Sequence, residues 1–143
     1  MIEEIKDGDE ILAIIVGSQF NKEGVSFFTP DSYSQQLAFM KHRKGHIIDA
    51  HVHTQVKRDV FYTEEVLVIR KGVLRVDFYR EDESYIRSRV LYSGDVILLA
   101  KGGHGFRALE DVEMFEIKQG PYLGDQDKRR FDGINENLVR LKG

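Results

Sequence analysis

Short apolar or alternating runs, each closed by turn residues, recur along this chain and constrain its fold most strongly. Leu74, Val76 and Phe78 alternate with polar residues, between the turn Lys71-Gly72 and the polar stretch Glu81–Ser84. A period of two is typical of a half-buried strand. About nine such runs at regular spacing favour an all-β sandwich or barrel. The expected strands are 11–16, 24–29, 36–42, 47–53, 65–70, 74–79, 85–91, 96–99 and 112–118.

Helical periodicity is confined to the C-terminal end of the chain. Ile134, Leu138 and Leu141 stand at i, i+4 and i+7, a spacing that places apolar side chains on one face of a helix. The segment therefore predicts either a short amphipathic helix or a frayed tail. The length of 143 residues is that of one domain, so we expect a single domain over residues 1–143.

Composition excludes several kinds of site and partner. The chain has no cysteine, so disulfides, zinc–thiolate sites and iron–sulfur clusters are excluded, and a metal would need imidazole, carboxylate, carbonyl or water ligands. The net charge of −3 lacks the basic excess that is typical of nucleic-acid-binding domains. The one basic cluster, Lys128-Arg129-Arg130, is interpreted as part of a solvated tail.

Export and membrane insertion are not expected from this sequence. No apolar run approaches the ~20 residues that span a bilayer. The N-terminus, MIEEIKDGDE, is acidic and lacks the apolar core of a signal peptide. We therefore expect a cytoplasmic protein that has neither a membrane nor a nucleic acid as its partner.

Two histidines, His51 and His53, are the clearest candidates for chemistry. Residues at i and i+2 project from the same face of a strand but not of a helix, so the expected strand 47–53 would direct both imidazoles to one ion. Glu65 begins the next expected strand, and His104 follows the turn Gly102-Gly103. Together these four residues predict a metal site of three imidazoles and one carboxylate.

This donor set suits a divalent transition metal, and it does not distinguish among iron, manganese, nickel, cobalt, zinc and copper. On a metal that prefers six ligands, four protein ligands leave two positions for water or substrate, which is typical of a catalytic site. Each residue also has a structural interpretation. The HxH pair can arise by chance on a strand, Glu65 can be a surface carboxylate, and His104 can be a loop histidine bonded to backbone.

The order of these residues resembles the first motif of the cupin superfamily. That motif is a glycine, five residues, HxH, a spacer, a glutamate, six residues and a glycine. The chain has Gly45, five residues, His51-Val52-His53, then Glu65, six residues and Gly72. Its spacer of eleven residues is longer than usual, so residues 54–64 are expected to be either a lid over a barrel mouth or a plain insertion.

A second segment is similar to the second cupin motif, in which a glycine, five residues and a Pro-x-Gly turn lead to a histidine. The chain has Gly94, five residues, Ala100-Lys101-Gly102 and then His104. The proline is missing and the histidine comes one residue early, which leaves the placement of His104 open. The resemblance covers residues 45–107. It implies a cupin double-stranded β-helix, which is a jelly-roll barrel, with the metal inside and a short C-terminal tail or helix.

The tail from Lys118 to Phe131 resembles small single-domain cupins associated with sugar-nucleotide or surface-polysaccharide pathways. This resemblance implies a small-molecule substrate such as a sugar or sugar nucleotide. It also implies metal-dependent isomerase or epimerase chemistry, or dioxygenase chemistry. Two alternatives stay open. One is a metal-independent sugar-nucleotide isomerase with a histidine base, and the other is a non-catalytic module that binds a small ligand or a sugar.

Further residues are candidates for catalysis, for substrate binding and for assembly. Asp49 shares the expected face of His51 and His53, so these three are the catalytic candidates. The apolar run 11–16 needs a cover, which a core strand or a partner subunit would supply. Jelly-roll barrels of the cupin type commonly pair through edge strands or swapped N-termini, so a homodimer is expected. The substrate-binding candidates are Arg43, Tyr62 and Tyr79.

Overall fold

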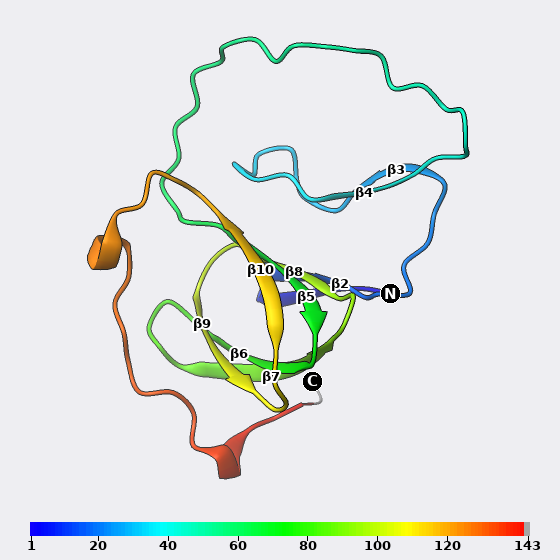
Figure 1. Ribbon diagram of the computed structural model, residues 1–143. Helices are drawn as coiled ribbons and strands as arrows, with labels where there is room; N and C mark the ends of the chain where they lie inside the picture. The colour runs from blue at the N-terminus through cyan, green and yellow to red at the C-terminus, as the bar shows by residue number, and fades with distance from the viewer. Residues whose placement is uncertain (142–143) are drawn as a thin grey trace. The chain divides into compact units, whose positions relative to one another are not determined.

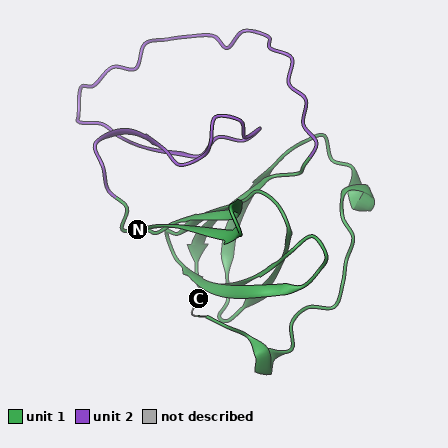
Figure 2. Ribbon diagram, turned by 180° about the vertical axis from the view of Figure 1, so that it is seen from behind, with its two compact units in different colours: residues 1–20, 62–143 green, residues 21–61 purple. Residues whose placement is uncertain are grey.

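The computed structural model describes residues 1–141, and the chain divides into two compact units (Figure 2). Unit 1 comprises Met1–Phe20 and Tyr62–Gly143, and unit 2 comprises Asn21–Phe61. Unit 1 holds a five-stranded sheet and a three-stranded sheet, whereas unit 2 holds a two-stranded hairpin. All strand pairs are antiparallel. The predicted all-β fold class is therefore confirmed.

The two sheets of unit 1 are built mostly from the predicted strands (Figure 1). In spatial order the five-stranded sheet contains β1 (Ile2–Asp7), β2 (Glu10–Val16), β8 (Val96–Leu99), β5 (Glu65–Lys71) and β10 (Glu113–Lys118). The three-stranded sheet contains β7 (Tyr85–Tyr92), β6 (Val73–Tyr79) and β9 (Gly103–Ala108). Neither sheet, as described over residues 1–141, closes on itself into a barrel. The alternation signal thus located the strands of unit 1, apart from β1 and β9.

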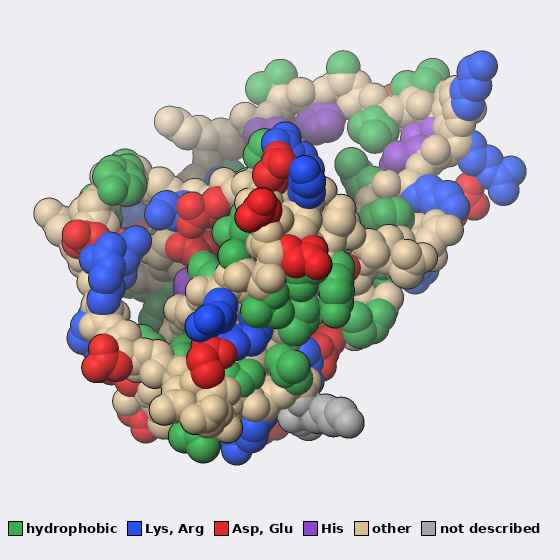
Figure 3. Space-filling model, turned by 60° about the horizontal axis from the view of Figure 1, so that its bottom comes forward, with side chains coloured by type: hydrophobic (Ala, Val, Ile, Leu, Met, Phe, Trp, Pro, Cys, Tyr) green, Lys and Arg blue, Asp and Glu red, His purple; other side chains and the backbone are tan. Residues whose placement is uncertain are grey.

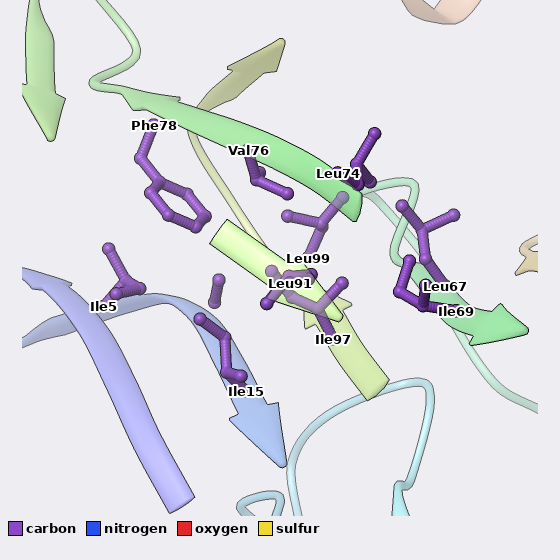
Figure 4. Close-up of a cluster of buried hydrophobic side chains, with 11 residues drawn as sticks. Ile5, Ile15, Leu67, Ile69, Leu74, Val76, Phe78, Leu91, Ile97 and Leu99 are labelled. Atoms are coloured by element: carbon purple, nitrogen blue, oxygen red, sulfur yellow. The ribbon is translucent and has the colours of Figure 1, made fainter. Parts of the chain in front are cut away.

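Apolar side chains from both sheets meet in one core (Figure 4). Leu74, Val76 and Phe78 project from β6 with the predicted period of two, and all three are buried. β2 lies between β1 and β8 and has buried residues from Leu12 to Val16, so this apolar run is a core strand. Removing such surface from water is the dominant favourable term in folding. The other core residues are Ile5, Ala13, Ile15, Leu67, Ile69, Leu91, Ile97 and Leu99.

The outer face of β6 is buried as well, because the C-terminal segment, residues 119–141, packs on it. The backbone N–H of Ile134 donates to the Tyr79 hydroxyl at 2.9 Å, and the Phe131 ring packs edge-on against Tyr79. Further along, the Arg140 N–H donates to the Tyr85 hydroxyl at 2.9 Å. The segment is therefore held to the three-stranded sheet at several points and is not a frayed tail.

The amphipathic helix predicted from Ile134 to Leu141 does not form. Within residues 1–141 the helical elements are two 3₁₀ helices, η1 (Gly124–Asp127) and η2 (Glu136–Leu138). Val139 is already extended, and the carbonyl of Arg140 accepts from the Ser88 N–H at 2.7 Å. Hydrogen bonds to β7 thus replace those that a helix would have made, so tertiary contacts override the weak local periodicity.

A polar network fixes the middle of this segment to β6. Arg75 donates to both carboxylate oxygens of Asp77, at 2.8 and 3.0 Å, and to both oxygens of Glu136, at 2.6 and 2.9 Å. Asp77 also accepts from the hydroxyl of Ser88, and Arg75, Asp77 and Ser88 are all buried. The adjacent guanidinium lowers the pKa of Glu136 to about 2. Bidentate, charge-assisted bonds of this kind are among the strongest in proteins.

Unit 2 contains one hairpin and a long segment without regular structure. β3 (Gly24–Phe27) pairs with β4 (Ala38–Lys41), as the strand signals predicted. The strand expected over 47–53 is absent, so that prediction is wrong. Ile47 and Val52 are 79% and 88% exposed, and residues 47–53 pair with no other strand. Alternation alone does not make a strand when neither a core nor a partner strand is available.

No helix within residues 1–141 has the length and apolar character that crossing a bilayer requires.

Candidate functional site

Two of the predicted metal ligands, Glu65 and His104, meet in unit 1. Glu65 is the first residue of β5 in the five-stranded sheet, and His104 is the second residue of β9 in the three-stranded sheet. His104 Nε2 lies 3.3 Å from Glu65 Oε2. The two sheets therefore bring together side chains that are 39 positions apart in sequence, counted as 104 minus 65.

The backbone around His104 explains how it reaches this position without the expected proline. Gly102 adopts a φ of +73°, in the left-handed region, and a Cβ there would lie 2.5 Å from the Tyr79 carbonyl oxygen. The turn leads straight into β9, where His104 is paired with Phe78 of β6. Glycine thus supplies the sharp turn and the close approach to β6, so His104 is placed by a regular strand.

A cavity of about 530 Å³ surrounds the Glu65–His104 pair. Its walls come from the start of β5, the ends of β6 and β8, the turn into β9 and the C-terminal segment. The volume is that of a site for a small molecule. The polar and aromatic side chains that line it are Tyr62, Thr63, Glu65, Tyr79, Arg80, Glu81, Glu83, Lys101, His104, Asp127, Lys128, Arg129, Arg130 and Phe131.

The electrostatics of the pair favour an ionised carboxylate. The contact with His104 lowers the pKa of Glu65 below its usual value of 4.5, and partial burial opposes this effect. Lys118 and Lys128 lower the pKa further through their charges. A carboxylate held in its charged form beside an imidazole can accept a hydrogen bond from the ring and stabilise its protonated form.

The predicted substrate-binding tyrosines both line this cavity. Tyr62 stacks against the Lys101 ammonium, which lies 5.3 Å from the ring centre. Tyr79 is buried, and its hydroxyl accepts a hydrogen bond from the Ile134 N–H. Tyr62 is therefore available to a ligand, whereas Tyr79 mainly positions the C-terminal segment.

The remaining predicted site residues belong to unit 2. Arg43 is exposed and forms an ion pair with Glu23 at 2.8 Å. The rings of His51 and His53 are 5.1 Å apart in an edge-on arrangement, and both residues are exposed. His51 Nδ1 contacts the backbone carbonyl of Asp49 at 2.8 Å, so it is this carbonyl, not the carboxylate, that orients the ring. Because a carbonyl only accepts, Nδ1 is the donor, and Nε2 is the ring atom free to bind a ligand.

The four predicted metal ligands are thus divided between the two units. Glu65 and His104 form a close pair in unit 1, and His51 and His53 form a looser pair in unit 2. Within residues 1–141, no group of three or more histidine, cysteine, aspartate or glutamate side chains is arranged to hold a metal ion. The four-ligand site stays a prediction.

Sequence reasoning missed the contribution of the C-terminal segment to the cavity. Asp127, Lys128 and Phe131 line it, together with Arg129 and Arg130. The interpretation of the basic cluster as a solvated tail is therefore incomplete, since these residues are exposed but border a cavity. The available signal was local: Phe131 is an aromatic residue directly after three cations, and its ring packs against Tyr79 of β6.

Comparison with known proteins gives no match to any family model, curated protein or solved structure.

Proposed function

We propose that unit 1 binds a small polar, carbohydrate-like molecule in its cavity, and that the Glu65–His104 pair is the reactive centre. The observation that carries this proposal is the 3.3 Å contact between His104 Nε2 and Glu65 Oε2 inside a cavity of about 530 Å³. Ionisable side chains that converge in a concave site are the usual signature of a functional centre. We also propose that the two sheets represent a jelly-roll architecture of the cupin type, in keeping with the motifs.

The reaction class that fits the pair best is isomerisation or epimerisation by proton transfer. His104 in its neutral form would accept a proton from the carbon next to a substrate carbonyl, and the electron pair of that C–H bond would move into an enediolate. Glu65 would stabilise the imidazolium that forms, because its carboxylate is ionised. For isomerisation, the hydroxyl proton of the enediolate would pass to the former carbonyl oxygen, and the imidazolium would deliver a proton to the former carbonyl carbon. For epimerisation, the imidazolium would return a proton to the opposite face of the original carbon after the enediolate has turned over in the cavity. The N–H proton of the imidazolium exchanges with solvent, so the new C–H bond would carry deuterium in D₂O. No oxidant or reductant is consumed.

A second candidate function, metal-dependent chemistry, is favoured by the separation of the two donor atoms. Two ligand atoms each ~2.1 Å from a zinc ion lie ~3.4 Å apart at the tetrahedral angle, close to the 3.3 Å between His104 Nε2 and Glu65 Oε2. One imidazole and one carboxylate therefore fit half of a transition-metal site. A bound metal would polarise a substrate carbonyl, while Glu65 and His104 would hold it in the cavity.

Replacing His104 by alanine is expected to abolish proton exchange in the cavity. The native protein is mixed with D-glucose, D-fructose and D-ribose in D₂O. Binding should shift the amide resonances of cavity residues, and catalysis should incorporate deuterium into the sugar at the carbon next to its carbonyl. His104→Ala should lower the exchange rate by ~10²–10⁴-fold, which is the usual contribution of a general base. Proton and deuterium NMR measure both effects.

The matched control is His46→Ala, because His46 is an exposed histidine of unit 2. It should leave binding and exchange unchanged. Binding without exchange would instead identify a non-catalytic sugar-binding module. Signal changes confined to residues outside the cavity would contradict the proposal altogether.

Metal binding is tested separately by elemental analysis of protein purified without a histidine tag. If the pair holds a metal, Glu65→Gln combined with His104→Ala should reduce the bound iron, manganese, nickel, cobalt, zinc or copper to background. A parallel His51→Ala, His53→Ala variant tests whether the predicted ligands of unit 2 contribute to the same ion. A metal content that none of these substitutions alters would show that the binding is unrelated to the predicted residues.

A further inference from the structure

The cations around the cavity of unit 1 are almost all neutralised by carboxylates. Figure 3 shows acidic and basic side chains interspersed over one face of the molecule, and the cavity walls follow the same pattern. A cation that already has a close carboxylate has less to gain from a ligand anion. The pairs are Arg80 with Asp7 at 2.9 Å, Lys101 with Glu10 at 2.8 Å, Arg129 with Glu83 at 3.1 Å and Arg130 with Asp125 at 3.1 Å.

The carboxylates that line the cavity are engaged too. Asp127 accepts from the Thr63 hydroxyl at 3.0 Å, and Glu81 accepts from the Gly102 N–H at 3.2 Å. Glu65 is in contact with His104. The acidic lining groups therefore have donors of their own, and a ligand anion would not meet a cluster of unsatisfied carboxylates.

Lys128 is the exception among the lining cations. Its ammonium makes no ion pair with any residue that the structure describes, and its side chain is exposed. It nevertheless borders the cavity, and its charge acts on Glu65. A solvated ammonium at the wall of this cavity is available to a charged group on a ligand.

The backbone at Lys128 is held in place on both sides. The preceding residue, Asp127, is bonded to Thr63, and the following residue, Arg129, is bonded to Glu83 at the other side of the cavity. Lys128 itself is extended at the end of η1, with a φ of −141°. The backbone of Lys128 is therefore held in the wall by its two neighbours, so only the lysine side chain has to be ordered when a ligand binds.

From this arrangement we propose that Lys128 binds an anionic group, a phosphate or a carboxylate, on the small polar molecule that occupies the cavity. The inference rests on the proposed function and specifies its ligand class. The anion would lie at the wall formed by the C-terminal segment, and the uncharged part of the ligand would lie against Glu65 and His104. Tyr62, which also lines the cavity, offers an aromatic face to that uncharged part.

The test compares three probes that share one sugar ring and differ in the charged group they carry: D-glucose with none, D-glucose 1-phosphate with a phosphate and D-glucuronate with a carboxylate. Isothermal titration calorimetry and amide NMR shifts give their affinities. A charge-assisted hydrogen bond should make at least one of the anionic probes bind about tenfold or more tightly than glucose. The probe that gains shows whether the site takes a phosphate or a carboxylate.

Lys128→Gln should remove this advantage and leave the affinity for glucose unchanged, which also shows that the variant is folded. Lys128→Arg should restore most of it, because the positive charge is retained. Two matched controls, Lys22→Gln in unit 2 and Arg130→Gln in the same wall, should have little effect, since Lys22 is remote in sequence and Arg130 is already paired with Asp125.

The outcomes separate this inference from the function on which it rests. Equal affinity for all three probes, or an equal loss for all three in Lys128→Gln, would overturn the assignment of Lys128 and leave the sugar-binding proposal standing. Failure of all three probes to move any cavity signal would contradict both. If Lys128→Gln still binds an anionic probe about tenfold more tightly than glucose, another cation binds the charged group, and the assignment of Lys128 is wrong.

Discussion

Replacing Asp77 by alanine is expected to lower the free energy of unfolding by ~3–5 kcal/mol, because it removes the buried carboxylate partner of the Arg75 guanidinium and leaves only Glu136, whose side chain is half-exposed. Arg75 and Asp77 are each 6% exposed, and Asp77 supplies both of its oxygens to Arg75. Glu136 would still contact Arg75, but from the exposed side. Urea denaturation followed by circular dichroism at neutral pH measures the loss.

Two further variants test the physical reason for this expectation. Arg75→Met with Asp77→Leu removes both charges and should be much less destabilising than Asp77→Ala, since no unpaired charge stays buried. Arg70→Ala removes an ion pair with Glu113 whose side chains are 60% and 48% exposed, and it should cost only ~0–1 kcal/mol. A loss of ~1 kcal/mol or less in Asp77→Ala would contradict the burial of the pair, because ~3–5 kcal/mol is expected for a truly buried one.

The burial of Arg75 and Asp77 is a part of the fold that strand periodicity could not predict. The period of two assigned Leu74, Val76 and Phe78 to one face of β6, and these residues are in the core. It could not show that Arg75 and Asp77 on the other face are buried too. Their burial depends on Glu136, which lies 61 positions beyond Arg75 in the sequence. Alternation reports one apolar face of a strand and carries no information about a polar face that a distant segment covers.

Only half of the candidate site formed as the sequence predicted, because the position of each residue depends on whether its segment finds a partner strand. Glu65 was expected at the start of a strand, and it begins β5 next to a core residue. His104 was expected beyond a glycine turn, and it lies on β9, a strand whose two glycines hid it from the alternation signal. For His51 and His53 the expected strand is absent. The motif order indicated which residues to examine, but strand formation required neighbours that spacing could not supply.

The wall formed by the C-terminal segment is the part of the site that strand periodicity and motif spacing did not predict. The sequence from Gly120 to Phe131 is polar and contains few core-forming residues, which is typical of an exposed tail. Phe131 instead holds this segment to the three-stranded sheet, because its ring packs on Tyr79. Gly103, which lies against the Phe131 ring and has no side chain, leaves room for that ring. A Cβ on Gly103 would come within 3.1 Å of the Phe131 ring. Two residues far apart in sequence thus place the basic cluster in the wall of the cavity that holds Glu65 and His104.

Among the glycines within residues 1–141, Gly72 is expected to tolerate alanine least, and Gly72→Ala should lower the free energy of unfolding by ~2–5 kcal/mol. Gly72 forms the turn between β5 and β6 with a φ of +88°, and the left-handed conformation costs an L residue ~1–2 kcal/mol. In addition, a Cβ there would lie 1.9 Å from the Asp111 carbonyl oxygen and 2.8 Å from its carbon. These are backbone atoms, so the chain around Asp111 must move, and such overpacking typically costs ~1–3 kcal/mol.

The comparison with Gly8→Ala separates the two contributions. Gly8 has a φ of +60° in the turn between β1 and β2, but a Cβ there would meet nothing within 4 Å. This variant therefore carries the conformational cost alone, ~1–2 kcal/mol, and urea denaturation of both variants gives the difference. If Gly72→Ala loses no more stability than Gly8→Ala, the close approach of Asp111 is not rigid. If it loses more, the glycine seven positions after Glu65 is required by the contact that closes the β5–β6 turn, which fixes the strand that carries Glu65.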